Sequence, residues 1–443
     1  MTAPETRSRL GTGYAKLWTA SVVSNLGDGV ATVAWPWLAS AVTRDPVLLS
    51  LTIVANRLPW LLFSLPAGVL TDRLDRRRTM VWMDVVRAVL VAGVAWAIGV
   101  GADSLSDPAL VGDETFLPPP GQGWWLALLY GSALAVGAAE VLRDNAAQTI
   151  MPRLVPASLL ERANGRLWGA EMVMNSFAGP PLGGWLVALA FAAPFWFDAG
   201  TFALAAVLVA SIGGTFGPAE RTGPPPARRF WGELRDGFRW LWQHRLLRTL
   251  AIVLGILNAA LALSFATLVL FAQEVLALDA TLFGTLLTAG AAGGVVGSFA
   301  AARISKALGP GTSLTIVMVG GIGAMAGIGL TSNWLVVWAM FFASSLLGVL
   351  WNVITVSLRQ EIIPDALLGR VNSVYRFFGW GMMPLGSLTG GAIVAVVEPV
   401  AGREWALRAP FLFAAGLFVA MTVVAAPRLT TARIEAARAG HGT

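Results

Sequence analysis

The residues of this chain that are best suited to chemistry are three carboxylates inside long apolar segments, Asp28, Glu140 and Glu171. A charged side chain inside a membrane-spanning segment is costly, and such residues mark proton and substrate pathways. A carboxylate in such a place can take up and release a proton, or it can bind an organic cation. We therefore predict that Asp28, Glu140 and Glu171 carry proton coupling.

Simple charge balance is the competing interpretation of each acid. Arg57 is expected at a depth similar to that of Asp28, so these two side chains could neutralise one another. Glu140 has no basic residue at its own level, because Arg143 lies one helical turn below it. Glu171 stands near one end of its segment, where a gate or a structural contact is the alternative. Glu140 is thus the better candidate proton carrier, and Asp28 could bind substrate instead.

Other charges in the same segments fit structural roles. Asp84 and Arg87 are three residues apart, a spacing that favours an ion pair on one helix face. Arg143 and its neighbour Asp144 are expected to join the same layer. Asp198 is predicted to lie too close to the outer end of its segment to count as deep.

Aromatic and amide side chains complete the predicted substrate-contacting set. The face of a tryptophan ring attracts organic cations, so Trp35, Trp37, Trp60 and Trp168 could offer aromatic surface to a cationic substrate. Each deep basic residue has an acidic neighbour, so we predict amphipathic substrates that are neutral or cationic. The residues expected to contact substrate are Asp28, Trp35, Arg57, Trp60, Glu140, Asn175, Asn258 and Asn352.

The elements that must position these residues are membrane-spanning helices. Of the 443 residues, 56% are hydrophobic and 13% are charged, whereas soluble domains have about 45–50% apolar and about 25% charged residues. We predict an all-α membrane protein with twelve transmembrane helices, since a span needs about 20 apolar residues. The runs are 17–42, 47–70, 79–101, 123–150, 164–190, 195–216, 246–273, 279–302, 312–331, 334–360, 370–396 and 407–426.

Composition also excludes several classes of protein. The chain has no cysteine and two histidines, too few ligands for a thiolate or histidine metal site. No nucleotide-binding loop ending in Gly-Lys-Ser/Thr is present, and the glycine-rich run 290–297 follows no strand, so it favours helix packing. We expect no metal, no cofactor and no enzymatic activity. The net charge of +6 does not indicate nucleic acid, because the basic residues follow the loops.

The basic residues predict the orientation. Most of the 31 lysines and arginines fall in loops on one side, while the outer loop 102–122 is acidic and has none. Basic loops stay in the cytoplasm, so we predict a multi-pass membrane protein with both termini cytoplasmic. A central segment with Gly223-Pro-Pro-Pro226 and an amphipathic helix from Arg229 divides the chain. The predicted domains are 1–216, a surface linker 217–245, and 246–443.

The loop Gly68-Val-Leu-Thr-Asp72-Arg73-Leu-Asp75-Arg76-Arg77-Arg78 resembles the signature loop between spans two and three of the major facilitator superfamily. Asp75 stands where that family usually has a second glycine. Aspartate tolerates the left-handed conformation better than most residues, so we expect the turn to be kept with Asp75 in that conformation. The resemblance implies that the loop is a conformational latch in which Asp72 contacts a helix N-terminus. The latch residues are Gly68, Asp72, Arg73, Arg76 and Arg77.

An internal repeat supports this resemblance. The segment Pro156-Ala-Ser-Leu-Leu-Glu-Arg-Ala-Asn164 matches Pro364-Asp-Ala-Leu-Leu-Gly-Arg-Val-Asn372. Two like-oriented halves of six spans are what the facilitator fold requires, with the substrate path between them near the midplane.

Shorter motifs are similar to those of the bacterial exporter branch of that family. They are Gly27-Asp28-Gly29, Trp35-Pro36-Trp37 and Asp198-Ala-Gly-Thr201-Phe202. This resemblance implies a drug:proton antiporter of the bacterial plasma (inner) membrane that exports small molecules. We expect it to be a monomer in the lipid bilayer. A dedicated exporter of one natural product or siderophore is the alternative. A membrane receptor, sensor or enzyme would need a soluble domain or a catalytic group of residues, and the sequence indicates neither.

Overall fold

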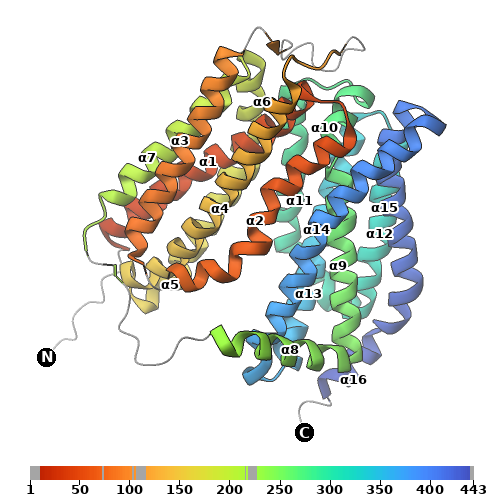
Figure 1. Cartoon of the computed structure of the whole chain (residues 1–443). Coiled ribbons are helices and arrows are strands. Elements are labelled where there is room, and N and C mark those ends of the chain that lie inside the picture. Colours follow the sequence, from red (N-terminus) through yellow and green to blue (C-terminus); the bar gives the residue numbers. More distant parts are fainter. Residues whose placement is uncertain are drawn as a thin grey trace, which may run out of the picture. The chain divides into compact units, whose positions relative to one another are not determined.

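The structure is a computed structural model of the chain and describes residues 10–71, 74–101, 104–105, 116–214, 216–217 and 227–439. These residues form helices and connecting turns, without a strand among them (Figure 1). Ten helices in the described residues are long and apolar enough to cross a membrane. The prediction of an all-α membrane protein is therefore confirmed. The predicted spans 17–42 and 164–190 are not among these ten, the second because it is divided into short helices, and the count of twelve stays a prediction.

The chain divides into two compact units. The first comprises residues 1–42, 55–221 and 279–285, and the second comprises 43–54, 222–278 and 286–443. Helices α2 (Pro46–Thr71) and α11 (Ala280–Leu308) therefore each contribute residues to both units. The pattern of hydrophobic runs does not indicate that a helix contributes to both units. The predicted division into 1–216, 217–245 and 246–443 stays a prediction.

The first unit is a helical bundle that includes α3. This helix (Arg76–Val100) packs against both α4 (Gln122–Leu154) and α7 (Ala192–Ala210). The long helix α1 (Gly11–Val42) packs along α7 and along α6 (Gly179–Leu189). The chain reaches α6 through the 3₁₀ turn η2 (Ala157–Leu159), α5 (Leu160–Glu171) and the π-helical turn η3 (Met172–Ala178).

The π-helical turn η3 interrupts the predicted span 164–190. The backbone N–H of Gly179 donates to the carbonyl of Met174, five residues back. Pro180 and Pro181 follow, and a proline has no N–H to donate and disturbs the regular pattern of hydrogen bonds in the turn before it. Such π-helical turns are frequent at functional sites.

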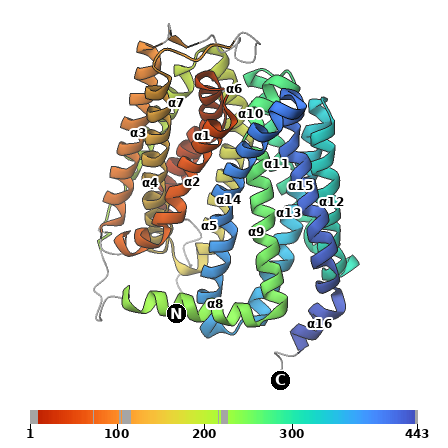
Figure 2. The ribbon, with the colours of Figure 1, turned by 45° about the vertical axis from the view of Figure 1, so that its right-hand side comes forward.

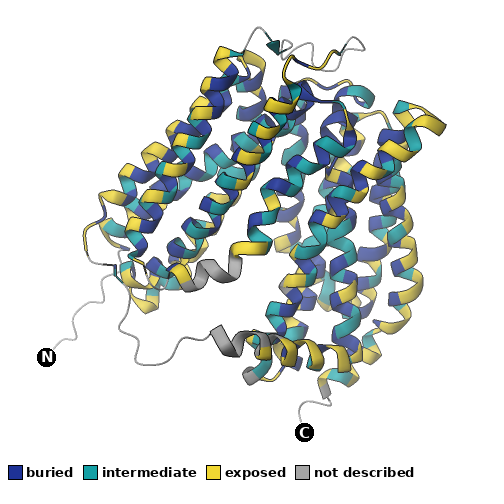
Figure 3. Ribbon diagram, viewed as in Figure 1, coloured by how far each residue is buried: buried dark blue, intermediate teal, exposed yellow. Residues whose placement is uncertain are grey.

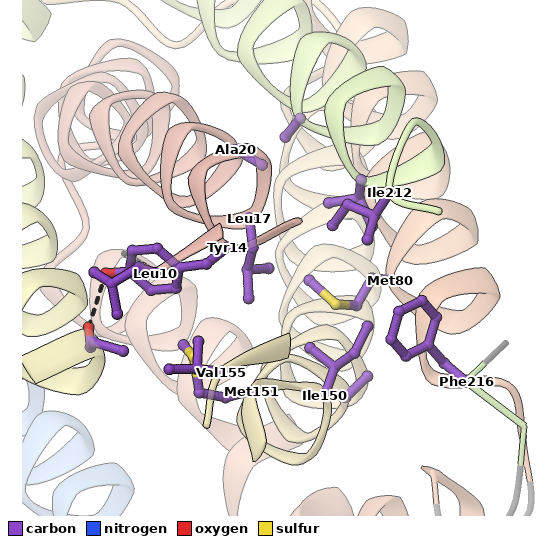
Figure 4. Close-up of a cluster of buried hydrophobic side chains, with 14 residues drawn as sticks. Leu10, Tyr14, Leu17, Ala20, Met80, Ile150, Met151, Val155, Ile212 and Phe216 are labelled. Carbon is purple, nitrogen blue, oxygen red and sulfur yellow. Dashed lines mark hydrogen bonds between the residues drawn. The ribbon is translucent and has the colours of Figure 1, made fainter. Parts of the chain in front are cut away.

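One end of the first unit is closed by a hydrophobic cluster, shown in Figure 4. Tyr14 and Leu17 of α1, Met80 of α3 and Ile150 of α4 are buried there together. The Tyr14 hydroxyl donates a 3.0 Å hydrogen bond to the carbonyl of Ala163, which fastens α1 to α5. Burial of this apolar surface stabilises this end of the bundle and holds its helices in register.

The second unit contains the remaining helices. They are α9 (Arg245–Phe265), α10 (Leu268–Leu270), the π-helical turn η4 (Phe271–Val275), α12 (Pro310–Leu330), α13 (Trp334–Ile362), α14 (Asp365–Ala401), α15 (Arg403–Ala425), η5 (Ala426–Arg428) and α16 (Thr431–Ala439). Helix α14 packs on α9 and α15, and α12 packs on α13 and α15. The linker contains α8 (Ala227–Gln243), which lies across the ends of α9 and α14 (Figure 2).

The outward faces of the helices are apolar as well as exposed (Figure 3). On α3 the side chains of Trp82, Val86, Val89 and Trp96 are all exposed, at spacings that keep them on one side of the helix. A stripe of large apolar side chains would be unfavourable in water and is expected where a helix faces lipid. The exposed stripe is thus the membrane-facing side of α3.

The expectation for Asp75 was wrong in its local conformation. Asp75 has φ −69° and ψ 116°, an extended conformation, and it is the N-cap residue of α3. Its carboxylate accepts a 2.9 Å hydrogen bond from the backbone N–H of Arg78. An aspartate is preferred at this position because it satisfies a free N–H of the first helical turn. The residue therefore starts a helix and does not replace a glycine in the left-handed region.

Candidate functional site

The candidate site is built around Asp28, where two glycines let other helices approach α1. A Cβ atom on Gly29 would lie 2.7 Å from the carbonyl oxygens of Met174 and Asn175 in η3. A Cβ atom on Gly27 would overlap the side chains of α7. The Gly-Asp-Gly sequence therefore places the Asp28 carboxylate at the point where α1, α7 and η3 meet.

Arg87 of α3 is the partner of Asp28. Its Nη2 atom donates to Oδ1 of Asp28, and its Nη1 atom lies 3.5 Å from the hydroxyl of Ser24. The guanidinium carbon also lies 3.7 Å from the centre of the Phe202 ring, an arrangement that favours a cation. The Arg87 side chain is 1% exposed, whereas that of Asp28 is 25% exposed. Arg87 thus holds the carboxylate from its buried side and leaves the other side accessible.

A second ion pair lies directly behind the first. The carboxylate of Asp84 is fully buried, with its Oδ1 atom 3.8 Å from Nη1 of Arg87 and 3.4 Å from Nε of Arg143. Arg143 also lies 3.3 Å from Asp144. The predicted Asp84–Arg87 pair and the shared layer of Arg143 and Asp144 are confirmed. Neither Asp84 oxygen accepts a hydrogen bond from the described residues.

The pairing of Asp28 corrects one alternative from the sequence. Arg57 was the expected neutralising partner, but its side chain is exposed and Asp28 is paired with Arg87. Depth along a helix can be counted from a sequence, whereas the direction in which a side chain points cannot. Arg87 was instead assigned to Asp84 alone because of their spacing along the chain.

Two further acids lie within electrostatic reach of Arg87, namely Glu140 and Asp198. Asp198 of α7 is 3% exposed, beside Gly27 of α1. Asp198 was expected to be too close to the outer end of its segment to count as deep, and this expectation missed that the side chain is buried beside Gly27, within the site. The Asp198-x-x-Thr201 motif could have indicated a buried Asp198, because a threonine three residues on can reach it. Thr201 donates a 2.7 Å hydrogen bond to the Asp198 carbonyl, and its hydroxyl lies 3.4 Å from the Asp198 carboxylate.

Glu140 and Glu171 differ in their surroundings. Glu140 of α4 is half-buried and forms no ion pair with any residue that the structure describes. Glu171 ends α5, has an exposed side chain and interacts electrostatically with Asp28 and Asp144. Asn175 is half-buried in η3, beside Gly29. Glu140 thus belongs to the inner group of acids, and Glu171 lies at its edge.

The predicted aromatic residues lie in different environments. Trp35 is half-buried and packs edge-on against Phe195, with 5.1 Å between ring centres. Trp60 is also half-buried. Trp37 is 1% exposed, so its ring offers no accessible face, while Trp168 is 70% exposed.

The predicted amide residues Asn258 and Asn352 belong to the second unit. Asn258 is half-buried and donates a 3.0 Å hydrogen bond to the carbonyl of Leu254 in its own helix. Asn352 is exposed. Their part in substrate contact stays a prediction.

The latch residues are described only in part. Asp72 and Arg73 lie outside the described residues, and Gly68 lies in α2 at a position whose surroundings are not described. The Arg76 backbone N–H donates to the carbonyl of Phe216 at 3.2 Å, and the Arg77 guanidinium donates to the carbonyl of Ile212 at 2.6 Å. These contacts fasten the start of α3 to the chain after α7. Whether the loop acts as a latch stays a prediction.

The site offers both acidic and basic groups for binding. Among the described residues, no three histidine, aspartate or glutamate side chains are placed to hold a metal ion. A group of carboxylates shared between two arginines can exchange protons and cations. Such a group inside a bundle of membrane-spanning helices is typical of one class of protein, the multi-pass membrane transporters.

The chain belongs to the Major Facilitator Superfamily, whose sequence profile matches residues 17–387. Membership of this family agrees with the prediction that the chain is not an enzyme. The resemblance of the loop after residue 68 is thereby confirmed at the level of the family.

Three relatives illustrate the likeness in sequence. The multidrug efflux pump Tap of Mycobacterium tuberculosis is 29% identical over 245 residues, which cover 53% of this chain and 52% of that protein. The chain thus spans about half the length of the Tap relatives that it matches in this way. Tap of Mycolicibacterium fortuitum is 26% identical over 84% of this chain and 87% of that protein. The enterobactin exporter EntS of Citrobacter koseri is 24% identical over 88% and 87%.

Solved structures agree on the fold. A bacterial homologue of the iron transporter ferroportin, in an inward-facing state, has a TM-score of 0.67 at 16% identity and covers 93% of this chain and 98% of that chain. A bacterial homologue of the lysosomal transporter Spinster has a TM-score of 0.65 at 14% identity and covers 98% of each chain. These similarities concern the fold alone.

Proposed function

We propose that this protein is a proton-coupled efflux transporter of amphipathic small molecules. The observation that carries the proposal is the arrangement of Asp28, which is partly exposed on one side and held by the buried Arg87 on the other. The likeness to Tap pumps and enterobactin exporters supports export as the direction of transport. The protein works as a monomer in the bacterial plasma membrane, with both termini in the cytoplasm.

The proposed coupling depends on the position of Arg87. A proton or a cationic substrate that reaches the exposed side of Asp28 weakens its attraction for Arg87. Asp84 lies 3.8 Å from the same guanidinium group and has no hydrogen-bond donor among the described residues. The guanidinium group is then free to move toward Asp84, which loosens the contact between α1 and α3. A small local event can in this way bias a larger conformational change.

The charge of the site supports neutral or cationic substrates. Carboxylates outnumber the arginines within electrostatic reach, so the group has an excess of negative charge unless protons or cations bind. The carboxylates are Asp28, Asp84, Glu140, Asp144 and Asp198, and the arginines are Arg57, Arg87 and Arg143.

Separate roles follow for the remaining residues. Glu140 is the proposed proton carrier, because it has no ion-pair partner in the described structure, and Glu171 is a relay at the edge of the site. Trp35, Trp60 and Asn175 are proposed to contact the substrate with Arg57. The signature loop, with Gly68, Asp72, Arg73, Arg76 and Arg77, is proposed to hold one conformation of the transporter.

The direct test is proton flux in everted vesicles as a panel of amphipathic compounds is added. A coupled exporter should move protons outward from the vesicle lumen when a substrate is supplied, and the response should vanish without the protein. Absence of any response to cationic and neutral compounds, with the protein correctly inserted, would overturn the proposal.

A dedicated exporter of one natural product is the second candidate. The enterobactin exporter EntS matches 88% of this chain at 24% identity, and Tap of Mycolicibacterium fortuitum matches 84% at 26%, so the likeness supports both candidates about equally. A response to a single compound of the panel, or to a siderophore alone, would support it over a multidrug pump.

A further inference from the structure

Helix α8 has a basic and aromatic surface that the proposed transport site does not use. The helix is fixed to the second unit on its inner side, where Leu241 is 1% exposed. A Cβ atom on Gly237 would lie 2.8 Å from the carbonyl oxygen of Arg370 in α14. Because α8 touches α14 this closely, its opposite side is presented in a fixed orientation.

Four residues of α8 form one continuous exposed surface. Arg235, Phe238, Arg239 and Trp242 are three or four residues apart, and side chains at these spacings are neighbours on a helix. Phe238 is 43% and Trp242 is 44% exposed. Their rings stack with 5.3 Å between centres. We refer to these four residues, with the adjoining Arg248, as the α8 patch.

Arg248 extends the patch onto α9. Its guanidinium carbon lies 5.6 Å from the centre of the Trp242 ring, and its Nη1 atom donates a 3.0 Å hydrogen bond to the Trp242 carbonyl. The exposed acid Asp236 is three residues from Arg239 and is its neighbour on the helix, but it lies away from Phe238 and Trp242, and the three arginines of the patch outnumber it. The patch therefore combines positive charge with an accessible pair of aromatic rings.

This combination fits the surface of an anionic bilayer. Stacked, exposed aromatic rings are unfavourable in water, and tryptophan favours the interface between lipid and water. The guanidinium group binds phosphate oxygens through two donors at once. α8 lies across the ends of α9 and α14, as a helix at the membrane surface does (Figure 2).

We propose that the α8 patch binds the headgroup of an anionic phospholipid. Arg235 and Arg239 contact the phosphate, and the rings of Phe238 and Trp242 lie at the level where the acyl chains begin. Through the Gly237 contact, the bound lipid holds α14 in place. The proposal depends on insertion into a membrane and not on which compound is transported.

The test measures phosphatidylglycerol binding to the full chain in mixed phosphatidylcholine micelles by native mass spectrometry. The double variant Arg235→Gln/Arg239→Gln should bind phosphatidylglycerol roughly 30-fold more weakly, at about fivefold per basic residue near an anionic surface. Trp242→Ala should also weaken binding, while Trp242→Phe should retain it. Binding of phosphatidylcholine should be unchanged in all variants.

A matched control removes two other exposed arginines of the same unit. Arg428 and Arg433 each donate to a nearby backbone carbonyl, and Arg428→Gln/Arg433→Gln should leave phosphatidylglycerol binding within about twofold of the wild type, as expected for surface substitutions away from a site. Equal losses in the two double variants would show a general charge effect and overturn the proposal.

Two other results would also contradict a lipid site. Displacement of phosphatidylglycerol by inorganic phosphate alone would show a simple anion site to which the rings of Phe238 and Trp242 do not contribute. Self-association of the wild type that Trp242→Ala abolishes, with lipid binding unchanged, would assign the patch to a second copy of the chain.

Discussion

The Nε atom of Arg143 lies 3.4 Å from Oδ1 of Asp84, a carboxylate with no exposed surface. Both side chains are deep in the first unit, and Arg143 is one of two arginines that compensate this carboxylate. Removal of one partner from such a pair leaves an uncompensated buried charge. That loss is far more costly than replacement of both partners.

The first prediction concerns this pair. Arg143→Gln should destabilise the protein by about 3–5 kcal/mol, the usual effect of breaking a buried ion pair. Asp144→Asn should have a much smaller effect, because the Asp144 side chain is 35% exposed. Thermal unfolding of the detergent-solubilised variants, followed by size-exclusion chromatography, measures both. Similar unfolding temperatures for Arg143→Gln and the wild type would contradict the prediction.

The second prediction concerns the close approach of α1 and η3. Gly29→Ala places a methyl group 2.7 Å from two carbonyl oxygens, so either the helices separate or the protein is destabilised by more than about 1 kcal/mol. Gly93→Ala is the matched control, because a Cβ atom there meets nothing within 4 Å. Alanine is a better helix former by about 1 kcal/mol, so the control should be neutral or stabilising. A neutral Gly29→Ala variant with normal transport would contradict the packing argument.

Much of the fold could be predicted from the sequence because the length of an apolar run determines whether it can span a membrane. The ten apolar helices follow this rule. The π-helical turn in the 164–190 segment could not be found in this way, since a run of apolar residues does not report which backbone hydrogen bonds form. The same is true of the segments 43–54 and 279–285, whose place in the units depends on contacts between distant helices.

The candidate site was predictable in its residue types but less so in its pairs. Asp28 and Glu140 were found because a charge in an apolar segment is conspicuous. The partner of Asp28 was missed, because Arg87 was assigned to the neighbour that lies three residues away. Asp198 was set aside on depth alone, although its distance from Asp28 depends on how α7 packs against Gly27.

The third prediction separates the latch from the helix cap beside it. By the proposed latch mechanism, Asp72→Asn should abolish or greatly slow transport while the protein remains folded and inserted. Asp75→Asn should leave transport and stability unchanged, because asparagine caps a helix about as well as aspartate. Asp75→Ala should cost about 1 kcal/mol through loss of the bond to the Arg78 N–H. Full activity of Asp72→Asn would remove the latch proposal.

The fourth prediction tests whether Asp28 and Glu140 carry proton coupling or only balance charge. Glu140 has no ion pair in the described structure, so Glu140→Gln should remain as stable as the wild type and lose drug-induced proton release in detergent. Asp28→Asn removes the partner of Arg87, whose side chain is 1% exposed. It should therefore lose stability as well as coupling, because the buried guanidinium group loses its closer carboxylate and keeps only Asp84, 3.8 Å away.

The double variant Asp28→Asn/Arg87→Gln distinguishes the two explanations for Asp28. Stability should recover in part in the double variant, since the guanidinium group that lost Asp28 is gone, while Asp84 keeps Arg143 as its one remaining arginine. Drug-induced proton release should stay lost because neither group can respond to the substrate. Arg57→Gln combined with Asp28→Asn is the control and should not restore stability, as Arg57 is exposed and is not the partner. If Asp28→Asn/Arg87→Gln regains both stability and coupled proton release, Asp28 only balances the charge of Arg87, and proton coupling must be assigned to Glu140 or another acid of the site.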